Sequence, residues 1–71
     1  MIFEHLVKFY KVNDDASVTV QVGDKYFRCK ARLDLAIALK ERKEGEEMIC
    51  KFGLAYVRGQ GLVIQLIEVI E

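Results

Sequence analysis

The feature that most constrains the fold of this chain is an alternation of apolar and polar residues over 17–33, interrupted once by a glycine. Valine occupies every second position of 18–22, with threonine and glutamine between. Period-2 alternation is typical of a β-strand with one buried face. Gly23-Asp24 follows, and the alternation resumes over 26–33. Because glycine suits the first position of a two-residue type II′ turn, the sequence predicts a β-hairpin here.

Three further segments favour strands. Residues 2–12 and 47–58 are rich in β-branched and aromatic side chains, and Gly53 inside the second segment predicts a bulge or tight bend. In residues 62–70, five of the nine side chains are β-branched, which favours a strand. A helix is the alternative for 62–70, because polar residues recur there at every third position.

Residues 34–45 allow two interpretations. The alternation could continue and give one long bent strand. A helix is favoured, because most residues of this segment are strong helix formers, Asp34 could cap the N-terminus and Gly45 could end the helix.

This order of elements predicts a mainly β (α+β) fold. We expect a small five-stranded OB-like or SH3-like barrel, with one short helix between the third and fourth strands. An open meander sheet covered by one helix is the alternative. With 71 residues the chain is expected to be a single domain, 1–71, with a marginal core.

The last segment is apolar on both faces if it is a strand, with Leu62, Ile64, Leu66 and Ile70 on one side and Val63, Ile67 and Val69 on the other. A strand in a small barrel normally has one wet face. We therefore expect either the helix or a second subunit to cover the apolar surface of the second face, and we predict a homodimer through Leu62–Ile70.

Composition and charge favour a soluble, cytoplasmic protein. The longest apolar runs are about five residues, against roughly 20 for a membrane-spanning helix, and no secretory signal is visible. Eleven basic and eleven acidic residues cancel, which argues against a generic polyanion binder. Residues 1–43 nevertheless carry nine basic and six acidic side chains, so a local basic face is compatible with the sequence.

Residues that could carry chemistry are few. His5, Cys29 and Cys50 cannot complete a tetrahedral zinc site alone, so we expect no metal and no cofactor. The two cysteines are expected to be buried core thiols, with a disulfide as the alternative. Gly59-Gln60-Gly61 lacks the lysine and the further glycine of phosphate-binding loops. With one serine, one threonine and one histidine, we do not expect an enzyme.

The most suggestive pattern is a basic strand face. On a strand, Tyr26, Arg28, Lys30 and Arg32 would project from one side at a spacing of about 6.6–6.8 Å, with Gln21 beside them across the hairpin. Cations that meet phosphates and a ring that stacks a base are the chemistry of single-strand binding. A solvated, charge-rich sheet face is the plainer interpretation of the same pattern.

The sequence therefore favours a non-enzymatic module that holds single-stranded DNA or RNA on this face, which Tyr10 and Lys8 could extend. The alternative is a small protein-interaction module, either a homo-oligomeric assembly subunit or an inhibitor of a larger protein.

Overall fold

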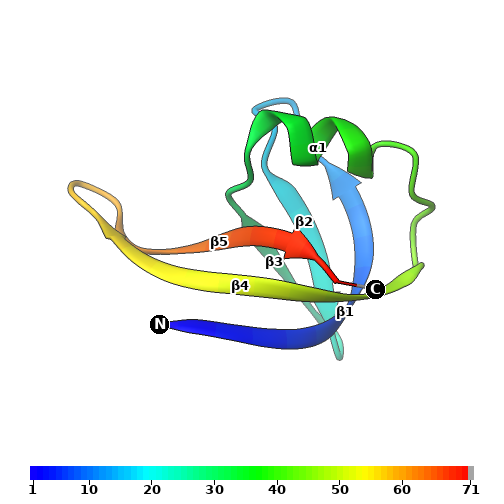
Figure 1. Cartoon of the computed structure of the whole chain (residues 1–71), viewed down its shortest axis with the longest axis horizontal. Coiled ribbons are helices and arrows are strands. Elements are labelled where there is room, and N and C mark those ends of the chain that lie inside the picture. Colours follow the sequence, from blue (N-terminus) through cyan, green and yellow to red (C-terminus); the bar gives the residue numbers. More distant parts are fainter. Residues whose placement is uncertain (71) are drawn as a thin grey trace.

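The computed structural model describes residues 1–70 as one five-stranded antiparallel sheet with one short helix (Figure 1). Its elements are β1 (Ile2–Val12), β2 (Val18–Val22), β3 (Lys25–Cys29), α1 (Leu33–Leu39), β4 (Glu47–Val57) and β5 (Gly61–Val69). The strand order in the sheet is β3-β2-β1-β4-β5. The mainly β class, with one helix between the third and fourth strands, is confirmed.

The long first strand, β1, is the centre of the sheet. Its residues Ile2 to Lys8 pair with β4, and Lys8 to Val12 pair with β2. The register with β2 shifts between Phe9 and Lys11, which leaves Tyr10 as an extra residue in a β-bulge. Figure 1 shows β1 curving as it passes from one partner to the other.

The two edges of the sheet meet at one residue, and the sheet is not closed into a barrel. Lys30 forms an isolated parallel bridge with Gln65. The Lys30 N–H donates to the Ile64 carbonyl at 2.9 Å, and the Leu66 N–H donates to the Lys30 carbonyl at 2.6 Å. The closed barrel predicted from the sequence is therefore not formed, and this short contact is the bridge between the two edges of the sheet.

The hairpin between β2 and β3 is confirmed. Val22 pairs with Lys25, so that the loop is Gly23-Asp24 alone. Gly23 has a φ of 63°, whereas the φ of Asp24 is not positive, which is the combination that a type II′ turn requires.

The prediction that β3 continues to Leu33 was wrong. The strand ends at Cys29, because the backbone of Lys30 leaves β2 and bonds to β5 instead. Arg32 then precedes α1 as its N-cap residue, outside the sheet.

The helical interpretation of the next segment is confirmed, but α1 is shorter than expected. Asp34 lies in its first turn and does not cap it, because the extended residue at the N-terminus is Arg32. The helix ends at Leu39, well before Gly45. The Gly45 N–H donates to the Phe9 carbonyl at 2.7 Å, so the chain is already back at the sheet by that point.

The last segment is a strand, and its helical alternative was wrong. The β4–β5 register shifts opposite Lys51 and Phe52, so that Ile67 is the extra residue of a bulge. Val69 therefore packs against the core although it was assigned to the other face, and Ile70 is exposed. Gly53 is not itself the bulge: a Cβ there would lie 3.2 Å from Ile67 Cδ1, so glycine makes room for it.

The core lies between the concave face of the sheet and α1. Its buried side chains are Val7, Phe9, Val18, Val20, Cys29, Ala36, Leu39, Met48, Cys50, Phe52 and Leu66. Both cysteines are buried and free, so the core-thiol prediction is confirmed and the disulfide alternative was wrong. Within residues 1–70, no helix has the length and apolarity needed to span a membrane.

Candidate nucleic-acid interface

An aromatic pair lies on the convex face of the sheet, opposite the core. The ring centroids of Tyr10 and Tyr26 are 4.9 Å apart, and the ring planes are inclined at 59°. Tyr10 is the extra residue of the bulge in β1, and Tyr26 comes from β3 on the far side of β2. Tyr26 is 56% exposed, so its ring is available to a ligand. Aromatic pairs at this separation and tilt attract each other, which fixes the two rings as one platform.

Two cations flank the aromatic pair. Lys11 Nζ lies 5.9 Å from the centroid of the Tyr10 ring, within cation–π distance. Thr19 of β2 pairs with Lys11 on one side and with Arg28 on the other, which brings both cations to the same stretch of the sheet. We call the five side chains of this surface the tyrosine face: Tyr10, Lys11, Gln21, Tyr26 and Arg28.

Beside the tyrosine face lies a shallow groove of about 320 Å³, where the β1–β2 loop meets Lys11 and Arg28. The loop is held in place by side-chain hydrogen bonds. Asn13 Nδ2 donates to Thr19 Oγ1 at 2.9 Å, and Ser17 Oγ donates to Asp15 Oδ1 at 2.6 Å. This network fixes the wall of the groove against β2.

The same loop places an acid near the cations. Hydrogen bonds from the hydroxyl and the backbone N–H of Ser17 lower the pKa of Asp15, and the charge of Arg28 lowers it further. Asp15 and Asp14 both line the groove. Because Asp15 stays ionised beside Arg28, it partly offsets the positive potential at that edge of the tyrosine face.

The basic row predicted from the sequence is divided into two parts. Gln21, Tyr26 and Arg28 do lie together, and Gln21 pairs directly with Tyr26 while its Nε2 donates to the Gly23 carbonyl at 2.9 Å. Lys30 and Arg32 instead line a separate groove of about 230 Å³, against side chains of β4 and β5. The division follows from the early end of β3.

Salt bridges also distinguish the cations. Arg32 Nε lies 3.5 Å from Asp34 Oδ1, so this guanidinium already has a carboxylate partner. The other two ion pairs among residues 1–70 are Arg42–Glu46 and Lys51–Glu68. Within this part of the chain Lys11, Arg28 and Lys30 therefore have no ion-pair partner.

Sequence reasoning missed Lys11. A regular strand would have placed it on the face opposite Tyr10, but the bulge turns both toward the convex side. The available signal was a slip in the apolar alternation of β1, which runs through Val7 and Phe9 and resumes at Val12. Such a slip indicates an extra residue between the last two.

Among the residues described, His, Cys, Asp and Glu side chains form no group of three that could hold a metal ion. The chain was also compared with protein-family models, with curated proteins and with solved structures, and none of the three comparisons found a match.

Proposed function

We propose that this chain is a non-enzymatic module that binds single-stranded DNA or RNA on the tyrosine face. The observation that carries the proposal is the pair of the exposed Tyr26 and the half-buried Tyr10, with Lys11 and Arg28 beside it. Bases stack on the aromatic platform, and the two cations neutralise phosphates on either side. Stacking of this kind tolerates any base, so we expect little sequence preference.

The arrangement of the strands supports the same proposal. We interpret the sheet as an incompletely closed OB-like barrel, because its edges β3 and β5 approach each other in parallel at Lys30 and Gln65 and a helix separates β3 from β4. Barrels of this kind bind oligonucleotides on the face of their second and third strands. Gln21, Tyr26 and Arg28 lie on those two strands. A cytoplasmic location suits the free thiols of the core.

The first test is fluorescence anisotropy with labelled single-stranded DNA and RNA of about ten nucleotides in about 50 mM salt. Loss of one stacking ring is expected to cost about 1–3 kcal/mol, or roughly 5- to 150-fold in affinity. We expect this loss for Tyr10→Ala and for Tyr26→Ala. Tyr56→Ala is the matched control, because Tyr56 is 74% exposed on β4 and lies outside the tyrosine face. Absence of binding by the unmodified chain would contradict the proposal.

Two double variants locate the phosphate contacts. Lys11→Gln with Arg28→Gln removes the cations of the tyrosine face, and Lys30→Gln with Arg32→Gln removes the same charge from the groove beside β4 and β5. We expect the first pair to weaken binding more strongly. The opposite ranking would move the site to the second groove.

An exposed apolar pair favours a second candidate function, in which the chain is a self-assembling interaction module. Tyr56 and Leu62 face each other near the far end of the β4–β5 hairpin, and they are 74% and 73% exposed. This end projects beyond the rest of the sheet (Figure 1). Within the predicted Leu62–Ile70 interface, Leu66 is buried in the core and cannot contact a second copy, whereas Leu62 and Ile70 are exposed.

Light scattering over a range of concentrations tests this candidate. A homodimer through the hairpin is expected to dissociate in Leu62→Lys and to persist in Leu33→Lys, which places the same charge on an exposed leucine of α1. A monomer at all concentrations, or a dimer that both variants leave intact, counts against this interface.

A further inference from the structure

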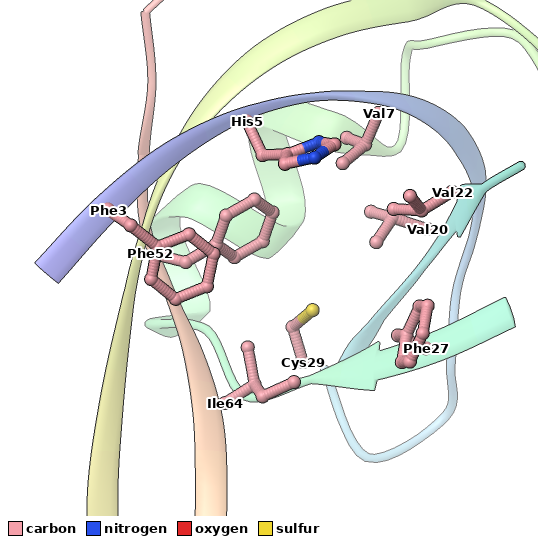
Figure 2. A pocket seen from close by; sticks show the side chains of 9 residues that line it. All are labelled: Phe3, His5, Val7, Val20, Val22, Phe27, Cys29, Phe52 and Ile64. Atoms are coloured by element: carbon pink, nitrogen blue, oxygen red, sulfur yellow. The ribbon is translucent and has the colours of Figure 1, made fainter. Parts of the chain in front are cut away.

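An apolar pocket of about 210 Å³ opens on the concave side of the sheet, away from the tyrosine face. All five strands contribute to its lining, and Figure 2 shows the side chains converging on a common space. Val20 and Cys29, which are buried, form part of the lining, whereas Phe27 and His5 are exposed. Phe3 and Phe52 stack at one side, with centroids 5.6 Å apart and planes at 27°.

The polarity of the pocket is concentrated in one group. Eight of the nine lining side chains are hydrocarbon or thiol, and the ninth is the imidazole of His5. A bound water needs two to four polar partners, which this lining does not offer. The pocket therefore suits an apolar occupant better than water.

The backbone fixes the hydrogen-bonding role of that imidazole. His5 Nδ1 lies 2.7 Å from the carbonyl oxygen of Leu6. A carbonyl can only accept, so Nδ1 must carry the proton. In the neutral ring Nε2 then keeps its lone pair and is an acceptor. A ligand that reaches His5 must therefore supply a donor.

We propose that this pocket binds a small aromatic molecule that carries one hydroxyl group, that is, a phenol. The ring lies among Phe3, Phe27 and Phe52, and its hydroxyl donates to Nε2 of His5. This inference goes beyond the proposed nucleic-acid site, because the pocket lies on the other side of the sheet. Occupation of the pocket and binding on the tyrosine face are expected to be independent.

The volume sets the size of the ligand. A dry apolar cavity of about 150 Å³ holds one benzene ring. A pocket of about 210 Å³ thus has room for a single ring with one or two small substituents. Aromatic side chains around the ring offer the tilted and offset contacts that aromatic groups prefer.

The test is an NMR titration of the full chain with p-cresol and with toluene at pH 8. The two probes differ by the hydroxyl. We expect both to shift the methyl resonances of Val20, Val22 and Ile64, with a dissociation constant for p-cresol on the order of 1 mM or lower. One hydrogen bond predicts about 2- to 12-fold tighter binding of p-cresol than of toluene.

Two variants separate the hydrogen bond from the cavity. His5→Leu keeps an apolar wall and removes the acceptor, so the preference for p-cresol is expected to disappear while toluene still binds. Val22→Phe fills the half-buried rim and is expected to abolish binding of both probes. Val57→Phe is its matched control, a half-buried valine outside the pocket, and is expected to bind both probes normally.

Three results would overturn the proposal. The first is that millimolar p-cresol leaves the pocket resonances unmoved. The second is that p-cresol and toluene bind the unmodified chain equally. The third is that His5→Leu keeps the preference for p-cresol. A dispersed spectrum of each variant shows that it is folded, so that loss of binding is not mistaken for loss of structure.

Discussion

Cys29 and Cys50 are the titratable side chains that lie buried in the core of residues 1–70. Burial, together with the smaller effect of the nearby Cys50 thiolate, raises the pKa of Cys29 to about 12; burial likewise raises the pKa of Cys50 to about 11, against a smaller lowering by Arg42. At neutral pH both are neutral thiols that pack as small apolar side chains. They are therefore structural groups, poorly suited to act as nucleophiles or metal ligands.

These raised pKa values predict an alkaline loss of stability. The unfolded chain releases its thiol protons from about pH 9, whereas the folded chain holds them to about pH 11–12. Stability is therefore fully present below pH 9 and is lost as the pH rises through that window. Between pH 8.5 and 10.5 we expect each thiol to account for a loss on the order of 1–2 kcal/mol.

The predicted alkaline loss is measured by urea unfolding of the unmodified chain and of Cys29→Ala at these two pH values, and the loss is expected to be smaller in Cys29→Ala. All other titratable groups are common to both proteins, so the difference in alkaline loss isolates the thiol. Equal alkaline losses in the two proteins would show that the thiol is not the cause.

At the scale of elements, α1 is the weakest unit of secondary structure. Its seven residues are too few for a helix that is stable alone, and its attachment depends on the buried Ala36 and Leu39. Its N-terminal N–H groups receive no side-chain acceptor, because the residue at the cap is Arg32. A long cation at this position also lacks the favourable interaction that an anion makes with the helix dipole.

Arg32→Ser is expected to stabilise the fold. A serine at the cap can accept a hydrogen bond from the first turn, which contributes about 0.5–2 kcal/mol. The exposed Arg32–Asp34 ion pair that is lost contributes little. Urea denaturation measures the change, and Arg32→Ala, which removes the cation without adding a cap, is the control. If the two variants are equally stable, the cap is not the limiting feature.

At the scale of the whole molecule, the charges balance but are not evenly spread. The chain has eleven basic and eleven acidic residues, so no long-range field draws a polyanion to it. Attraction to a nucleic acid must come from local cations. Lys11 and Arg28, with Lys8 near them on β1, would supply about three phosphate contacts.

The salt dependence of binding follows from this count. Each phosphate contact with a single strand contributes a slope of roughly −0.7 in a plot of log affinity against log salt. Three contacts predict that raising the salt from about 50 to 200 mM weakens binding about 20-fold. Anisotropy titrations at four salt concentrations give the slope. A slope near zero would mean that the phosphates are not contacted.

Local patterns predicted the elements well. The alternation of valines gave β2 and its hairpin, and the β-branched residues of β1, β4 and β5 gave their strands within a residue or two. Local patterns could not predict which strand the end of each strand pairs with. The bridge at Lys30 depends on β5, which is 35 positions later in the chain, and this contact ended β3 and moved Arg32 out of the proposed site.

The two β-bulges also changed which side chains share a face of the sheet. An extra residue at Tyr10 brought Lys11 to the tyrosine face, and one at Ile67 exchanged the sides of Val69 and Ile70. Both arise from how two strands fit along their whole length. Alternation within one segment predicts which residues share a side only until the first such irregularity.

The single bridge between Lys30 and Gln65 has a consequence for motion. Among residues 1–70, the two backbone hydrogen bonds of Lys30, directly after β3, connect this edge to β5, whereas ladders of several residue pairs join the neighbouring strands of the sheet. Sparse hydrogen bonding lowers the free energy of local opening. We therefore expect the contact of Lys30 with β5, which we call the seam, to open more readily than the rest of the sheet. Cys29 and Ile64, which flank the seam, also line the apolar pocket. Local opening of this seam would therefore displace two residues of the pocket wall, on the side of the pocket where β3 meets β5.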